Sequence, residues 1–106
     1  MRHISPRQLK LYLEQVESPP LLLDVRERWE HQICHLTGSQ FLPMRQVPAA
    51  YPNLNRNRET VVICHHGVRS HQVAYFLEQM GFENVINLTG GLAAWAREVD
   101  SNMPIY

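Results

Sequence analysis

The sequence lacks long apolar runs and an excess of either charge. No segment approaches the roughly 20 consecutive apolar residues that a membrane-spanning helix needs, so we expect no membrane partner. Its 10 basic and 10 acidic side chains balance, which argues against a nucleic-acid binder that depends on a basic face. The N-terminal residues 1–6 lack the apolar core of a signal peptide, and we therefore expect a cytoplasmic protein.

Cysteine is also scarce, with only Cys34 and Cys64 in the chain. A structural disulfide is not expected in a reducing compartment, so each thiol needs its own explanation. The pattern His31-x-x-Cys34-His35 matches no common zinc spacing, and no Cys-x-x-Cys pair is present. We therefore predict that Cys34 is a packing residue, and that the protein has no metal site and no other cofactor.

The length of 106 residues is typical of one domain, and the 44% of apolar residues is typical of a globular chain. We therefore predict a single domain over residues 1–106. Residues 21–25 form a short apolar run typical of a buried strand, and 60–64 and 84–88 are also predicted to be strands; 40–42 could be another short strand.

Helical patterns alternate with these runs. A capping box from Ser5 to Gln8 opens the first helix, and Gly81 ends the third. Apolar residues recur at helical spacing in three sets: Leu9, Tyr12, Leu13 and Val16; Val73, Phe76, Leu77 and Met80; Leu92, Trp95, Ala96 and Val99. A short helix is expected over 26–32, and turns with one helical turn over 48–57. This alternation predicts a parallel sheet in an α/β sandwich.

The loop from Cys64 to Ser70 carries the clearest chemical signal. Sites in parallel sheets lie at the carboxyl ends of the strands, and a tight turn into a helix points backbone N–H groups inward. Cys64 would face these donors, which favour the nucleophilic thiolate. Gly67 permits a close approach or positive φ, and Arg69 offers a charged fork for an oxyanion. The alternative is an inert core cysteine, but the glycine, the arginine and the following helix favour a reactive thiol.

Loop length separates two chemistries. Cysteine phosphatases use Cys-x5-Arg, which would place arginine at position 70, whereas this chain has Arg69 followed by Ser70. Because this loop is one residue shorter than the phosphatase loop, its ring of backbone N–H groups should be narrower. The narrower ring suits a single sulfur atom on Cys64 better than a tetrahedral phosphate.

These features resemble the rhodanese domain family over nearly the whole chain. The matching segments are Leu23-Asp24-Val25-Arg26 with Glu30, His35 with Gly38, the loop 64–69, and Gly90-Gly91 with Trp95. The chain departs from the family at 34–39, where the family often has Gly-His-Ile-Pro-Gly-Ala. The departure lies away from the loop in sequence and therefore concerns the local turn more than the chemistry.

The resemblance implies a three-layer sandwich, with a five-stranded mostly parallel sheet and helices on both faces. It implies a sulfurtransferase that moves a sulfane sulfur from thiosulfate or a similar donor to cyanide, a small thiol or a protein acceptor. Cys64 would carry the sulfur as a persulfide. The loop residues that would hold it are His65, His66, Gly67, Val68, Arg69 and Ser70.

The resemblance and the sequence also assign supporting roles. Asp24 could be catalytic, but the Asp24-x-x-Glu27 box favours a cap of the short helix. Arg26 is expected to form a structural ion pair rather than bind substrate. His65 or His66 could act as an acid–base group, although loop side chains in this family mostly point outward.

Two other functions remain open at this point. One is a cysteine phosphatase or arsenate reductase on the same fold, which the short loop argues against. The other is a non-catalytic rhodanese module that binds a partner. The presence of Cys64 argues against that module, because inactive members typically lose the cysteine.

Overall fold

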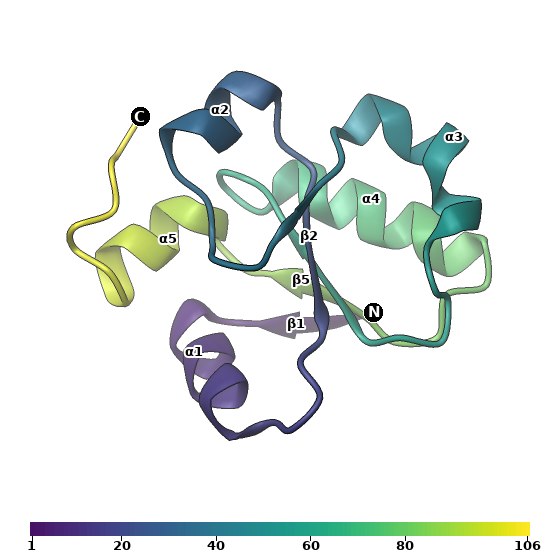
Figure 1. Cartoon of the computed structure of the whole chain (residues 1–106), viewed down its shortest axis with the longest axis horizontal. Coiled ribbons are helices and arrows are strands. Elements are labelled where there is room, and N and C mark those ends of the chain that lie inside the picture. The colour runs from purple at the N-terminus through teal and green to yellow at the C-terminus, as the bar shows by residue number, and fades with distance from the viewer.

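The computed structural model describes all 106 residues and contains one five-stranded sheet. Its strands are β1 (Arg2–Ile4), β2 (Leu21–Asp24), β3 (Gln40–Phe41), β4 (Thr60–Ile63) and β5 (Val85–Leu88). Their order across the sheet is β1-β5-β4-β2-β3, and every neighbouring pair is parallel (Figure 1). The predicted α/β sandwich is confirmed, with a sheet that is wholly rather than mostly parallel.

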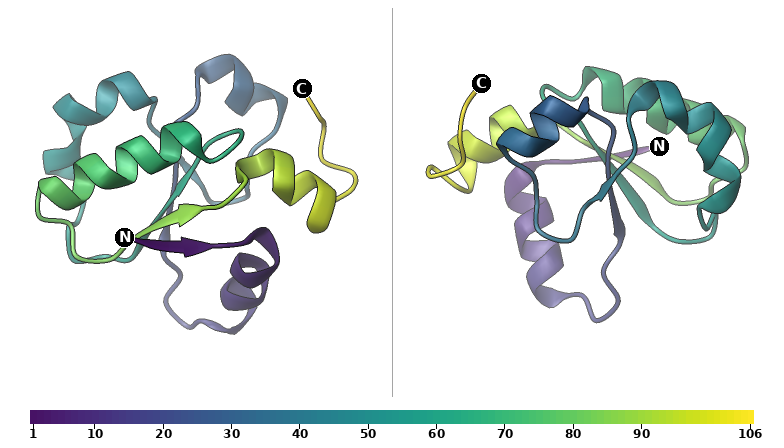
Figure 2. Two further views of the ribbon diagram at one scale, coloured as in Figure 1. Left: turned by 180° about the vertical axis from the view of Figure 1, so that it is seen from behind. Right: turned by 45° about the horizontal axis from the view of Figure 1, so that its top comes forward.

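Helices cover both faces of the sheet (Figures 1 and 2). They are α1 (Pro6–Gln15), α2 (Arg28–Ile33), α3 (Val47–Ala50), α4 (Val68–Gln79) and α5 (Gly91–Glu98), with 3-10 turns η1 (Met44–Gln46) and η2 (Tyr51–Asn53). Helices α3 and α4 pack on one face, and α1 and α5 pack on the other. No helix combines the length and the apolar character that crossing a membrane would require.

The central strands supply both halves of the core because successive side chains point to opposite faces. Leu23 and Val62 pack toward α3 and α4. Leu22, Val61 and Ile63 pack toward α1 and α5. Since β2, β4 and β5 are buried throughout, their apolar runs are continuous rather than alternating, which is typical of parallel sheets.

Two segments differ from the sequence-based prediction. Strand β1 was not predicted from its residues, because three edge residues that are partly exposed carry no apolar pattern. Residues 44–53 form consecutive helical turns, although only one turn was expected within 48–57.

The predicted cap at Asp24 is wrong. Helix α2 begins two residues later than expected, and its N-cap is Glu27, whose backbone N–H donates to Glu30 Oε2 at 2.8 Å. Asp24 instead binds Arg26, because the guanidinium two residues away offers it two charged donors.

Candidate active site

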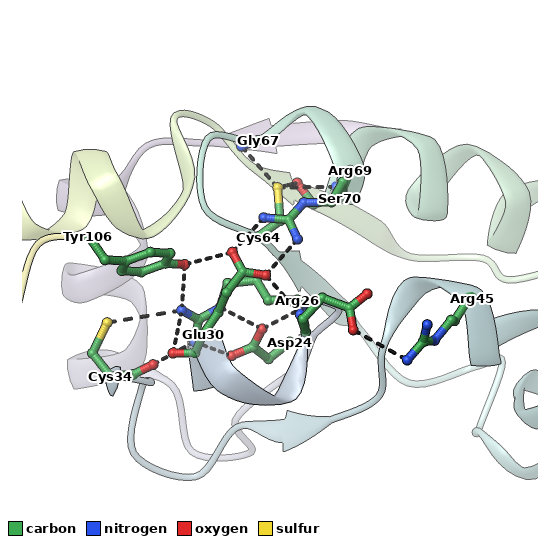
Figure 3. A network of polar contacts seen from close by, with 11 residues as sticks. Asp24, Arg26, Glu30, Cys34, Arg45, Cys64, Gly67, Arg69, Ser70 and Tyr106 are labelled. Carbon is green, nitrogen blue, oxygen red and sulfur yellow. Dashed lines mark hydrogen bonds and ion pairs between the residues drawn. The ribbon is translucent and has the colours of Figure 1, made fainter. Parts of the chain in front are cut away.

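Cys64 lies directly after β4, the middle strand of the sheet, and in front of the N-terminus of α4. Its side chain is 1% exposed. The sulfur accepts hydrogen bonds from the backbone N–H groups of Gly67 at 3.0 Å and Ser70 at 3.3 Å, and the thiol donates to Ser70 Oγ at 3.3 Å (Figure 3). The inward-pointing N–H groups expected from the loop are therefore present around the sulfur.

Gly67 makes the tight turn into α4. It is the N-cap residue and has φ +93°, in the left-handed region that favours glycine. A Cβ at this position would lie 3.0 Å from the backbone nitrogen of Gly90 and 3.3 Å from the carbonyl oxygen of Leu88. Both the conformation and the lack of space therefore require glycine.

The N-terminus of α5 supports the Cys64 loop from behind. The N–H of Leu92 donates to the Cys64 carbonyl at 2.9 Å, and the N–H of Ala93 donates to the His65 carbonyl at 3.0 Å. A Cβ on Gly91 would lie 2.3 Å from the Cys64 carbonyl oxygen. This close approach fixes the peptide planes of the loop and hence the direction of its N–H groups.

Arg69 does not present a free fork to an oxyanion, contrary to the sequence-based expectation. Its two terminal nitrogens bind the Glu30 carboxylate at 2.7 and 2.9 Å. The Glu30 side chain is 4% exposed and that of Arg69 34%. Burial by itself would raise the pKa of Glu30, but the hydrogen bonds and charge of Arg69 hold it down to about 2. The pair joins the Cys64 loop to α2.

Arg26 forms the structural ion pair that was expected. Its Nε and Nη2 bind Asp24 at 2.9 and 2.7 Å, and both side chains are almost fully buried. Its remaining donors reach the carbonyl oxygens of Glu30 and Cys34 and the hydroxyl of Tyr106. Burial opposes the charge of Arg26, but the hydrogen bonds that it donates to Asp24 and Tyr106 raise its pKa above the ordinary value.

Tyr106 is part of this network and was not predicted. Its hydroxyl accepts from Arg26 at 2.8 Å and donates to Glu30 Oε1 at 3.1 Å (Figure 3). Its ring lies 4.1 Å from the ring of His65 and meets Trp29 edge-on at 5.6 Å. Burial raises the pKa of Tyr106 to about 12, which keeps the hydroxyl protonated and able to donate.

The other side chains of the loop differ in exposure. His66 and Val68 point to solvent, as the family pattern suggests. His65 is half-buried against Tyr106, and its Nδ1 atom is buried without a hydrogen-bond partner. Burial and the neighbouring His66 lower the pKa of His65, which favours the neutral ring at neutral pH.

Asn87, on β5, completes the surroundings of the thiol and was also missed. Ser70 Oγ donates to Asn87 Oδ1, and Asn87 Nδ2 donates to the Gly67 carbonyl at 3.4 Å. Asn87 is 4% exposed. A buried amide within the apolar run 85–88 is itself unusual, and this was the signal that could have identified it.

Cys34 does not join Cys64. Both thiols are free, and Figure 3 shows Cys34 on the far side of Arg26 and Tyr106. The Cys34 sulfur lies 4.0 Å from Arg26 Nη1 and 3.7 Å from the carbonyl oxygen of Pro104. The structure therefore places the 65–70 loop around Cys64. Asp24 and Arg26 lie in the neighbouring network of Glu30 and Tyr106, and Cys34 contacts Arg26 outside the loop.

Residues 5–98 match the rhodanese-like domain family. The chain belongs to that family. A sulfurtransferase from Allochromatium vinosum is 36% identical over 77 residues, which cover 73% of this chain and 72% of that protein. The chloroplastic rhodanese-like/PpiC domain-containing protein 12 from Arabidopsis thaliana is 42% identical over 89 residues, covering 80% of this chain.

The rhodanese fold itself is shared with solved structures. A rhodanese-like domain protein from Staphylococcus aureus superimposes with a TM-score of 0.85 at 29% identity, covering 100% of this chain and 99% of that one. The chain spans only 23–30% of the length of several curated relatives, among them the Arabidopsis protein. It corresponds there to one part of a longer protein.

Proposed function

We propose that this rhodanese-like chain is a sulfurtransferase in which Cys64 carries a sulfane sulfur as a persulfide. The observation that supports this most directly is the convergence of two backbone N–H groups on a buried cysteine sulfur at the start of a six-residue loop. Such donors stabilise negative charge on sulfur without requiring a charged side chain. One domain over residues 1–106 would carry both half-reactions.

In the first half-reaction, the Cys64 thiolate attacks the outer sulfur of thiosulfate or a similar donor. A new S–S bond forms, the donor's own S–S bond breaks, and sulfite leaves with the bonding electron pair. The product is the Cys64 persulfide, whose terminal sulfur carries the negative charge. The loop N–H groups of residues 65–70 are the proposed binding site for that sulfur.

In the second half-reaction, a thiolate or cyanide attacks the outer sulfur of the persulfide. The acceptor gains that sulfur, the persulfide S–S bond breaks, and the electron pair returns to Cys64 as the thiolate. Donor and acceptor thus react in turn at one site, which predicts ping-pong kinetics. We propose a small thiol or a protein as the acceptor.

The Arg69–Glu30 pair bears on the choice of donor. Because the two terminal nitrogens of Arg69 bind Glu30, the positive charge near the loop is balanced by a carboxylate. Arg69 would give little additional binding to a dianionic donor. We therefore expect persulfide donors to be used at least as well as thiosulfate.

The test is intact-protein mass spectrometry after incubation with thiosulfate or an organic persulfide, followed by turnover with cyanide or a thiol. We expect the mass to increase by one sulfur atom, the increase to be absent in Cys64→Ser, and the added sulfur to be lost to the acceptor. Hydrolysis of an aryl phosphate without any persulfide would instead support the phosphatase alternative. Neither activity in a folded protein would support the non-catalytic binding module.

A further inference from the structure

We propose that Asn87 is a positioning residue that controls how readily Cys64 ionises, by drawing the Ser70 hydroxyl proton away from the sulfur. The three side chains form a buried chain of contacts: the Cys64 thiol donates to Ser70 Oγ at 3.3 Å, and Ser70 Oγ donates to Asn87 Oδ1. All three are less than 5% exposed. Water is therefore not available to replace a lost partner.

The orientation of the Asn87 amide follows from its second contact. The other end of the amide faces the carbonyl oxygen of Gly67 at 3.4 Å. A carbonyl oxygen can only accept, so the NH2 group must face Gly67 and the amide oxygen must face Ser70. An amide oxygen can only accept as well, and hence Ser70 is the donor in the contact with Asn87.

Ser70 has a single hydroxyl proton, and this limits what it can do for Cys64. With the proton directed at Asn87, a lone pair of Ser70 Oγ faces the sulfur, an arrangement that suits a protonated thiol. When Cys64 loses its proton, that lone pair faces an anion. Ser70 can turn to donate to the thiolate only by leaving the buried Asn87 oxygen without a donor. Either arrangement carries a free-energy cost that the thiol form does not have.

The persulfide form of Cys64 avoids the free-energy cost that the Ser70 hydroxyl imposes on the free thiolate. If Cys64 holds a persulfide, as proposed above, the charge lies on the outer sulfur and Ser70 can keep its bond to Asn87. The backbone N–H groups of Gly67 and Ser70, which donate to the Cys64 sulfur in the free thiol, do not depend on the direction of the Ser70 hydroxyl. Asn87 would therefore disfavour the free thiolate relative to the thiol and the persulfide.

Charged and titratable groups surround the loop, but no hydrogen bond or ion pair joins them to the side chain of Ser70 or Asn87. They are His65, His66 and Arg69 on the loop, Glu30 on α2, Asp24 at the end of β2, Arg26 after it, and Tyr106. His3 on β1 pairs with Asn87 in the sheet, and its ring stacks on that of His71 on α4. The carboxylates and guanidiniums among them are paired with one another. Their contribution to the ionisation of Cys64 should be nearly the same in variants of Asn87 and Ser70.

The test is the pH dependence of Cys64 alkylation by iodoacetamide, in a Cys34→Ser background and without any sulfur donor. Asn87→Leu removes the competing acceptor and frees Ser70 to donate to the thiolate. A hydrogen bond to a charged group corresponds to about one pH unit or more, so the alkylation midpoint should fall by about that amount. An unchanged or higher midpoint in a folded variant would overturn the proposal.

Ser70→Ala provides the matched control. It should raise the midpoint in the Asn87→Leu background but not in the protein that retains Asn87. If the shift caused by Asn87→Leu persists without the Ser70 hydroxyl, Asn87 acts through the loop backbone at Gly67 and the proposal fails.

Circular dichroism shows whether Asn87→Leu folds. If it does not fold, the test is Ser70→Ala in the protein that retains Asn87. A rise of the alkylation midpoint by about one pH unit would show that Ser70 already donates to the thiolate, and would overturn the proposal. No rise would support the proposal. Because no sulfur donor is present, these outcomes are independent of whether sulfur transfer occurs.

Discussion

Helices α4 and α5 begin in the same way but use their N-termini differently. Each follows a parallel strand through a glycine N-cap with positive φ, Gly67 at +93° and Gly90 at +75°, and neither has a side-chain cap. At α4, backbone N–H groups of the loop and first turn bind the Cys64 sulfur. At α5, N–H groups of the first turn bind the carbonyl oxygens of Cys64 and His65.

The difference shows that the same glycine-capped helix N-terminus can bind a reactive group or hold a neighbouring loop in place. Which of the two it does depends on the acceptor that the fold places next to its N–H groups. The free N–H groups of a helix N-terminus need acceptors. A cysteine provides the acceptor at α4, and the backbone of the neighbouring turn provides it at α5. The second turn fixes the first, so the donors around the sulfur are already in place before any substrate binds.

Replacing the sulfur should have the largest effect on activity. Cys64→Ser keeps a small side chain in front of the α4 donors but removes the thiolate nucleophile, so we expect sulfur transfer to be abolished with an unchanged circular dichroism spectrum. Cys34→Ser is the control and should retain activity, because Cys34 lies outside the loop. Turnover retained in Cys64→Ser, or lost only in Cys34→Ser, would contradict the assignment.

Adding a side-chain atom where Gly91 packs against the Cys64 loop should have the largest effect on stability. Gly91→Ala places a Cβ 2.3 Å from the Cys64 carbonyl oxygen, at a residue with φ +59°. We expect a loss of about 3 kcal/mol or more, measured by urea unfolding. Gly38→Ala is the matched control, because Gly38 has φ +82° with nothing within 4 Å of the added atom. Only the backbone strain of about 1–2 kcal/mol should appear there, and equal losses in both variants would show that the contact with α5 is not tight.

Breaking the link from the loop to α2 should have an intermediate effect. Glu30→Gln removes the charge that binds Arg69, and we expect a loss of about 1–3 kcal/mol at pH 7, less than for a fully buried pair because Arg69 is partly exposed.

The pH dependence of that loss gives a further check. The pKa of Glu30 falls from an ordinary 4.5 to about 2 in the folded protein, because the hydrogen bonds and charge of Arg69 outweigh the effect of burial. Its stabilising contribution is therefore complete above pH 4.5 and is lost as the pH falls toward 2. The stability gap between the wild type and Glu30→Gln should narrow over this window in urea titrations, and a constant gap would contradict the ion-pair argument.

Removing an exposed loop side chain should have the smallest effect. His66 precedes Gly67 as Thr89 precedes Gly90, and both side chains are exposed. We expect His66→Ala and Thr89→Ala each to change stability by less than about 0.5 kcal/mol, and His66→Ala to change kcat/KM by no more than about twofold. A much larger loss of activity in His66→Ala alone, in steady-state assays, would assign His66 an acid–base role.

Much of the fold could be predicted because its signals are local. The apolar runs at 21–25 and 60–64 became β2 and β4, and the capping box from Ser5 to Gln8 begins α1 as predicted. Strand β1 could not be predicted from its residues, because it exists only through its pairing with β5. The N-cap of α2 could not be predicted either, because the Asp24 carboxylate accepts hydrogen bonds from Arg26 instead of from the helix.

The sequence by itself determined the position of Cys64 at the end of a strand, the glycine that turns the chain, and the helix that follows. These features depend on residues a few positions apart, whose geometry is fixed by backbone conformation. Only the tertiary structure decided which groups meet across the site. Arg69 binds Glu30 from 39 positions away, Tyr106 binds Glu30 from 76 positions away, and Ser70 binds Asn87 from 17 positions away. A charged or polar side chain pairs with whichever complementary group the packed layers bring within reach, and no periodicity in the sequence encodes that partner.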